Sequence, residues 1–128
     1  MGNLLEGHVA VVTGGGSGIG EGIAIGYAEQ GASVAILDVN LEAGSHVAKT
    51  ISTKRGKAIS LGLDVTDRES CDGVAGKVSE QLGPVSILVN NAGTAQRQPT
   101  EDMPLEVWDR IVQINQTQVF LCSREVGK

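Results

Sequence analysis

The sequence has few aromatic, cysteine and basic residues. Its 128 residues include one Tyr, one Trp and one Phe, and its two cysteines, Cys71 and Cys122, have no CxxC spacing. Two thiols without a disulfide framework favour a reducing compartment, and packing rather than metal or redox chemistry. The 10 basic against 15 acidic residues leave a net charge of -5, which argues against binding to the phosphate backbone of a nucleic acid.

Long apolar runs are also missing. No segment is long enough to cross a bilayer, and the first six residues, MGNLLE, lack the charged and apolar regions of a signal peptide. Internal repeats, low-complexity stretches and linkers are absent from the sequence. We therefore expect a single cytoplasmic domain over residues 1–128 that has no metal, membrane or nucleic-acid partner.

Glycine, by contrast, is abundant, with 18 of 128 residues, about twice the usual share. The glycines interrupt otherwise apolar, periodic sequence instead of forming a linker. This pattern is typical of a chain whose backbone must approach a ligand closely.

Four short apolar runs, at residues 8–13, 33–38, 58–64 and 85–90, are nearly continuous rather than alternating. Strands that are buried on both faces have this pattern, which indicates a parallel sheet. Nothing else in the chain can pair with the outer edge of the fourth run, so the sheet looks incomplete.

The segments between these runs have helical spacing. In each of the first two expected helices, the apolar residues share one face. The third begins at a capping box, TDRE at residues 66–69, and ends at Gly83-Pro84. A fourth helix is expected from Pro104 to Lys128, with proline in its first position. The order β-α-β-α-β-α-β-α predicts an α/β, Rossmann-type doubly wound sheet with about four strands and four helices. The apolar positions that carry these assignments are Ile19, Ile23, Gly26 and Tyr27; Leu41, Val47, Ala48 and Ile51; Cys71, Val74, Ala75, Val78 and Leu82; and Val107, Ile111, Val119 and Cys122.

The motif TGGGSGIG, at residues 13–20, joins the first strand to the first helix. Glycines there allow a sharp turn that brings backbone N–H groups against a pyrophosphate at a helix N-terminus. A P-loop is excluded, because no Gly-Lys-Ser/Thr follows the glycines. The alternative is a glycine-rich turn without a ligand.

Gly14, Gly18 and Gly20 form GxxxGxG rather than GxGxxG. Together with NNAG at residues 90–93, an Asp at the end of the second and third strands, and Asn115 in the fourth helix, this spacing resembles the short-chain dehydrogenase/reductase family along essentially the whole chain. The resemblance implies an NAD(P)-dependent oxidoreductase that transfers a hydride between the cofactor and a small carbonyl or alcohol substrate. It also implies a homo-oligomer when the protein is complete.

Asp38, 18 residues beyond Gly20, is expected to set the choice of cofactor. A carboxylate there accepts hydrogen bonds from the ribose hydroxyls of NAD and repels the 2′-phosphate of NADP. Neither Ser17 nor Val39 supplies a cation for that phosphate, so the sequence predicts NAD rather than NADP. The alternative role for Asp38 is to cap the helix that begins near Asn40.

The resemblance implies further site residues. It places Asp64 and Val65 at the adenine, gives Thr13 and Asn90 structural roles, and makes Asn115 catalytic through a water molecule. The position of Asn115 on the apolar stripe of its helix also fits a satisfied core Asn, and Asp64 also fits a strand-end residue. The expected cofactor-binding residues are Gly14, Gly16, Ser17, Gly18, Ile19, Gly20, Asp38, Asp64, Val65, Asn91, Ala92 and Gly93.

The catalytic Ser and the Tyr-x-x-x-Lys pair of the family are not found in these residues. The single tyrosine, Tyr27, is followed four residues later by Gly31, and we expect it in the core. His8 and His46 lie away from the strand ends where ligands bind. We therefore expect a front half that stops before its acid/base chemistry. The alternative is a non-catalytic NAD-binding module or sensor.

Overall fold

A four-stranded parallel sheet forms the centre of the computed structural model, which describes residues 2–63, 69, 72–93 and 99–127. The strand order is β3-β2-β1-β4. β2 has the predicted bounds, and the other strands begin and end within about two residues of the prediction. The strands are β1 (Val9–Thr13), β2 (Ser33–Asp38), β3 (Lys57–Gly62) and β4 (Ile87–Val89).

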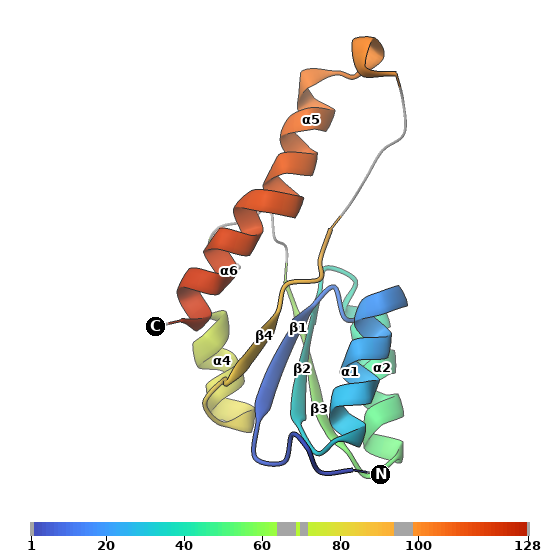
Figure 1. Ribbon diagram of the computed structural model, residues 1–128, viewed down its shortest axis with the longest axis vertical. Coiled ribbons are helices and arrows are strands. Elements are labelled where there is room, and N and C mark those ends of the chain that lie inside the picture. The colour runs from blue at the N-terminus through green and yellow to red at the C-terminus, as the bar shows by residue number, and fades with distance from the viewer. Residues whose placement is uncertain (1, 64–68, 70–71, 94–98, 128) are drawn as a thin grey trace.

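Helices cover both faces of this sheet (Figure 1). α1 (Gly18–Glu29) and α2 (Leu41–Thr53) lie on one face, and α4 (Val74–Leu82) and α6 (Gln118–Val126) lie on the other. Alternate residues of β1 and β2 point to opposite faces, so each strand contributes to two cores and needs apolar residues at almost every position. The predicted doubly wound α/β architecture is confirmed. One core contains Ala10, Val12, Val34, Ile36, Val47 and Ile51, and the other contains Val9, Val11, Leu37, Val78 and Cys122.

The faces of the first two helices differ from the prediction in their first turns. Ile19 and Leu41, which we expected in the core, are 78% and 51% exposed. The buried side of α1 instead passes through Gly20 and Ala24, and that of α2 begins at Gly44. Each first turn lies at the end of a strand, where the apolar spacing of the helix continues but the sheet does not extend beneath it.

The third predicted helix appears as α4, which ends at Gly83 with φ 107° as expected for a glycine stop. Val74 and Val78 are buried, in agreement with the predicted stripe. α4 begins after Gly73, which makes no side-chain cap. Most of the predicted capping box at residues 66–69, and Cys71, lie outside the described residues.

The fourth predicted helix contains a break in its spacing. After a short 3-10 turn, η1 (Thr100–Asp102), α5 (Leu105–Val112) leads through a π-helical segment, η2 (Gln113–Thr117), into α6. Pro104 is the N-cap of α5 rather than its first residue. The π segment winds the chain by an i→i+5 pattern, so a stripe extrapolated at 3.6 residues per turn is displaced beyond it.

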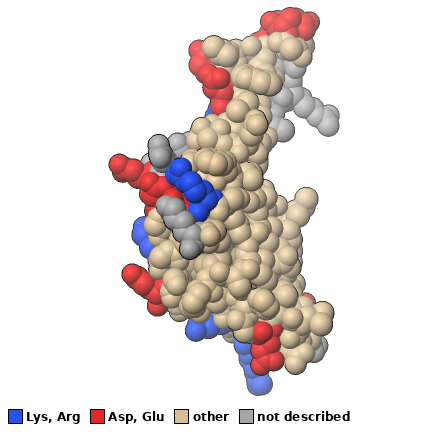
Figure 2. Space-filling model, turned by 60° about the vertical axis from the view of Figure 1, so that its left-hand side comes forward, with Lys and Arg blue, Asp and Glu red and all other residues tan. Residues whose placement is uncertain are grey.

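α5 projects away from the sheet (Figure 1), and none of its residues is buried. Leu105 and Trp108 are 69% and 57% exposed. Among the described strands, β4 pairs only with β1, so its outer edge is open. In Figure 2, most of the surface between the acidic tip and the base carries no charged side chain. In the part of the chain that the structure describes, no helix is both long and apolar enough to span a membrane.

These surfaces predict that a polypeptide of these 128 residues self-associates. Exposed apolar surface and an open strand edge are both sites of association. Sedimentation velocity should show an average mass that rises with concentration. Replacing Leu105 and Trp108 with Glu should reduce this rise, whereas Leu4→Glu, at a residue 82% exposed on another part of the surface, should not. A monodisperse monomer at all concentrations would contradict the prediction.

Candidate functional site

The loops that follow β1 and β4 are joined by one buried hydroxyl group. Thr13, the last residue of β1, is 0% exposed. Its Oγ1 accepts hydrogen bonds from the backbone N–H groups of Asn91 and Ala92, each at 3.0 Å, and donates to the carbonyl of Val89 at 3.4 Å. A buried hydroxyl with three partners fixes the two loops relative to one another. Thr13 therefore connects the end of β1 to the loop that follows β4.

The same two loops approach so closely that glycine is required. Gly14 has φ 65°, and a Cβ atom there would lie 2.9 Å from the Cα of Ala92. A Cβ on Gly20 would overlap the carbonyl oxygen of Gly14 and the side-chain nitrogen of Asn91. That nitrogen donates to the Gly14 carbonyl at 3.1 Å. The first turn of α1 is therefore packed against the ends of β1 and β4.

The N-terminus of α1 is open at this edge of the sheet. Its N-cap, Ser17, makes no side-chain capping bond and is exposed. Within the described chain, no hydrogen bond holds the N–H groups of Gly18, Ile19 and Gly20. Such N–H groups, at the positive end of the helix dipole, form an anion site. The exposed side chain of Ile19 stands beside them and provides an apolar wall.

Asp38, at the end of β2, reaches across to the glycine loop. Its Oδ2 accepts from the N–H of Gly16 at 2.9 Å, and its Oδ1 accepts from the N–H of Asn40, also at 2.9 Å. α2 is capped by Asn40, whose Oδ1 accepts from Ala43 at 3.0 Å. The alternative interpretation of Asp38 as the cap of α2 is therefore wrong. The carboxylate lies beside the loop, and Val39, the next residue, is exposed.

Gly93, in the loop that follows β4, lies beside Asn115. A Cβ on Gly93 would stand 3.1 Å from Oδ1 of Asn115. Asn115 itself is exposed and lies in the π segment, so our inference that it occupies a buried apolar stripe is wrong. The 3.6-residue spacing on which that inference depended does not hold through a π segment. Asn90 donates to Ser123 of α6 at 3.2 Å, which connects the end of β4 to that helix.

Two expected site residues, Asp64 and Val65, lie outside the described residues. Within the described chain, no group of three or more His, Cys, Asp or Glu side chains could hold a metal ion. Gly15, where a Cβ would lie 3.0 Å from Ile36, was not among the predicted site residues. Asn40 was not predicted as a cap either, although an Asn that begins a helix is a recognisable cap signal.

The chain is similar in sequence to known dehydrogenases. A family model described as short chain dehydrogenase matches residues 8–128. D-threitol dehydrogenase of Mycolicibacterium smegmatis is 40% identical over 124 residues, which cover 97% of this chain and 48% of that protein. The 7alpha-hydroxysteroid dehydrogenase of Escherichia coli is 38% identical over 123 residues, or 96% of this chain and 48% of that protein. The chain thus spans about half the length of these relatives.

The chain also superposes closely on solved structures of dehydrogenases. A short-chain type dehydrogenase/reductase from Mycobacterium marinum superposes with a TM-score of 0.91 at 38% identity, over 95% of this chain and 49% of that one. A 7alpha-hydroxysteroid dehydrogenase complexed with NADH and 7-oxo glycochenodeoxycholic acid also gives 0.91 at 38% identity, over 95% and 48%. Because the family model matches residues 8–128 and these solved structures superpose on almost the whole chain, the chain belongs to the short-chain dehydrogenase/reductase family.

Proposed function

We propose that these residues form the nucleotide-binding part of an NAD-dependent oxidoreductase that converts an alcohol to a carbonyl compound, or the reverse. The observation that carries the proposal is the contact between Asp38 and the Gly16 N–H, because it places a carboxylate beside the open N-terminus of α1. A dinucleotide has a pyrophosphate and a ribose diol next to one another, and these two features match its chemistry.

The phosphate part of the site fits such a ligand. The loop is compressed against Asn91 and Ala92 on one side, while the N–H groups of Gly18, Ile19 and Gly20 remain available on the other. Backbone donors of this kind bind a pyrophosphate without a lysine. Because glycines have no side chains, the loop leaves room for the phosphates beside the N-terminus of α1. The Ser17 hydroxyl, at the N-cap of this helix, adds a further donor.

The ribose part of the site favours NAD. The Asp38 carboxylate carries a negative charge and has more acceptor capacity than its two backbone donors use, so it can accept from ribose hydroxyl groups. Glu42, in the first turn of α2, adds a second negative charge nearby. No cation stands at Ser17 or Val39 to neutralise a 2′-phosphate.

The nicotinamide part of the site is assigned to Ala92, Gly93 and Asn115. The nicotinamide, when bound, supplies or accepts the hydride. Ala92 and Gly93 leave the space for its ring, and Asn115, whose Oδ1 lies against Gly93, is positioned to hold a water molecule in a proton path. The substrate is a small molecule with a hydroxyl or carbonyl group, and the whole protein is expected to be a homo-oligomer.

The choice of cofactor can be tested at Asp38. We expect the chain to bind NADH about tenfold more tightly than NADPH, because a like-charge contact costs at least about 1.4 kcal/mol. In Asp38→Ala this ratio should fall to about one, since the repulsion and the ribose contacts are both removed. Competition titrations with the two reduced cofactors measure the ratio.

The ratio, rather than either affinity, is the appropriate quantity. Asp38→Ala also removes the hydrogen bond to Gly16, which weakens both cofactors and cancels in the ratio. Glu42→Gln is the matched control for a more distant negative charge, and it should change the ratio less. A preference for NADPH in the unmodified chain, or an unchanged ratio in Asp38→Ala, would refute the assignment.

A further inference from the structure

A recess lies near the end of the sheet that is opposite to the glycine loop (Figure 1). It is enclosed by the C-terminal halves of α1 and α2 and the turn before β3, and it has about 300 Å³ of empty space including its open mouth. Its floor is apolar and is formed by Ile25 and Ala28 from α1 and by Ile51 from α2. The side chain of Ile51 is only 2% exposed. None of these residues takes part in the site described above.

The rim of this recess carries both signs of charge. Glu29 stands on the α1 side, and Lys54 and Arg55 stand on the α2 side. None of the three makes a hydrogen bond or ion pair through its side chain with another described residue. Opposite charges therefore line one mouth without neutralising one another.

The backbone at Arg55 has an unusual shape. α2 ends in a Schellman motif, in which the N–H of Gly56 donates to the carbonyl of Ile51 at 3.0 Å and the N–H of Arg55 donates to that of Ser52 at 3.1 Å. This turn normally has glycine at the left-handed position, but here Arg55 occupies it with φ 67°. A side chain in that conformation costs about 1–2 kcal/mol. A costly residue without a partner at a recess is a reason to look for a ligand.

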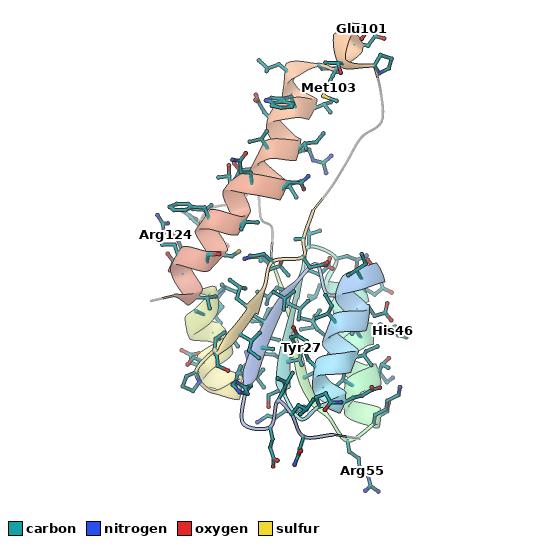
Figure 3. The ribbon with its side chains drawn as sticks, viewed as in Figure 1. Tyr27, His46, Arg55, Glu101, Met103 and Arg124 are labelled. Atoms are coloured by element: carbon teal, nitrogen blue, oxygen red, sulfur yellow. The ribbon has the colours of Figure 1, made fainter. Side chains whose placement is uncertain are left out.

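The side chain of Arg55 extends from the base of the molecule, near the start of the chain (Figure 3). Because it is long and without a partner, it can fold back over an anion at the mouth without moving the backbone. Gly56 follows at a point where a Cβ would lie 2.5 Å from the side chain of Ile51. The turn therefore keeps the recess open beside the two cations.

We propose that this recess binds a small aliphatic α-amino acid of about the size of leucine. Its carboxylate would lie against Lys54 and Arg55, its ammonium against Glu29, and its side chain on the floor of Ile25, Ala28 and Ile51. A zwitterion completes both charges of the rim, whereas a simple carboxylate or amine would leave one of them without a partner. The exposed rim limits the expected dissociation constant to about 1 mM.

Saturation-transfer NMR tests the proposal with the unmodified chain, and this method tolerates self-association of the protein. Leucine is compared with three ligands that each lack one of its groups. N-acetyl-leucine lacks the ammonium, leucinamide lacks the carboxylate, and glycine lacks the aliphatic side chain. We expect leucine to bind about tenfold more tightly than any of the other three. Equal binding of N-acetyl-leucine or leucinamide, or no transfer to leucine, would overturn the proposal. Addition of AMP should not displace leucine, since displacement would assign the signal to the glycine loop.

Variants locate the site independently. Arg55→Gly should weaken leucine binding about tenfold, while its melting temperature stays the same or rises by up to about 4 °C, because the left-handed strain is relieved. Lys57→Ala, which removes a neighbouring cation that does not line the recess, should leave binding unchanged. Unchanged binding in Arg55→Gly, or an equal loss in Lys57→Ala, would contradict the assignment.

Discussion

Gly20→Ala should weaken dinucleotide binding by a factor of about 5 to 150, whereas Gly22→Ala, in the same helix, should not affect it. A methyl group on Gly20 would overlap the carbonyl oxygen of Gly14 and the side chain of Asn91, so the loops after β1 and β4 must separate. Overpacking of this kind costs about 1–3 kcal/mol. If this free energy is lost from the bound state, the affinity falls by a factor of about 5 to 150, because about 1.4 kcal/mol corresponds to a factor of ten.

Gly22 provides a matched control. A Cβ at this position has no atom within 4 Å, and the residue is exposed. Alanine there should stabilise α1 by about 0.5–1 kcal/mol and leave affinity unchanged. Calorimetric titration with NADH and a thermal melt of both variants separate the two effects. Equal affinities in the two variants would show that the close approach of the loops does not matter for binding.

A polypeptide of these 128 residues should bind NADH without oxidising it. A positioned general acid contributes about 10²–10⁴-fold to a rate, and the available candidates are badly placed. Tyr27 packs against the core between the sheet and α1. His8 bonds to Ser86 at the opposite end of the sheet, and His46 lies on the outer side of α2 (Figure 3).

The assay for this prediction is the loss of NADH absorbance in the presence of ketones, aldehydes and sugars. We expect no turnover above the rate without protein. Turnover that co-purifies with the chain and disappears in Asn115→Ala would contradict the prediction, because it would require a proton donor that the described residues do not provide. The same assay on a longer protein that continues into a Tyr-x-x-x-Lys segment is the positive control.

The sheet could be predicted from the sequence because parallel strands are buried on both faces. Continuous runs such as Val9–Thr13 and Ser33–Asp38 have few other interpretations. Helix faces could be predicted only where a helix lies over the sheet. Ile19 and Leu41 continue the apolar spacing past the ends of the strands, where the surface has no partner in the described chain.

The site was predictable in its glycines but not in its contacts. The spacing of Gly14, Gly18 and Gly20 identifies a loop, yet only the structure shows that Asp38 bonds to that loop and that Asn40, rather than Asp38, caps α2. Asn115 was found through a resemblance, while its burial was inferred from a period that the π segment breaks. A local change of helix type has no simple signal in a single sequence.

The most direct test of the central claim is a fluorescence titration of the chain with NADH. We expect saturable binding of one NADH per chain, which ADP-ribose displaces because it retains the pyrophosphate and both riboses. The affinity should fall at least about fivefold in Gly20→Ala and be kept in Gly22→Ala. Binding that does not saturate, that ADP-ribose fails to displace, or that is equally tight in Gly20→Ala and Gly22→Ala would contradict a dinucleotide site at the glycine loop.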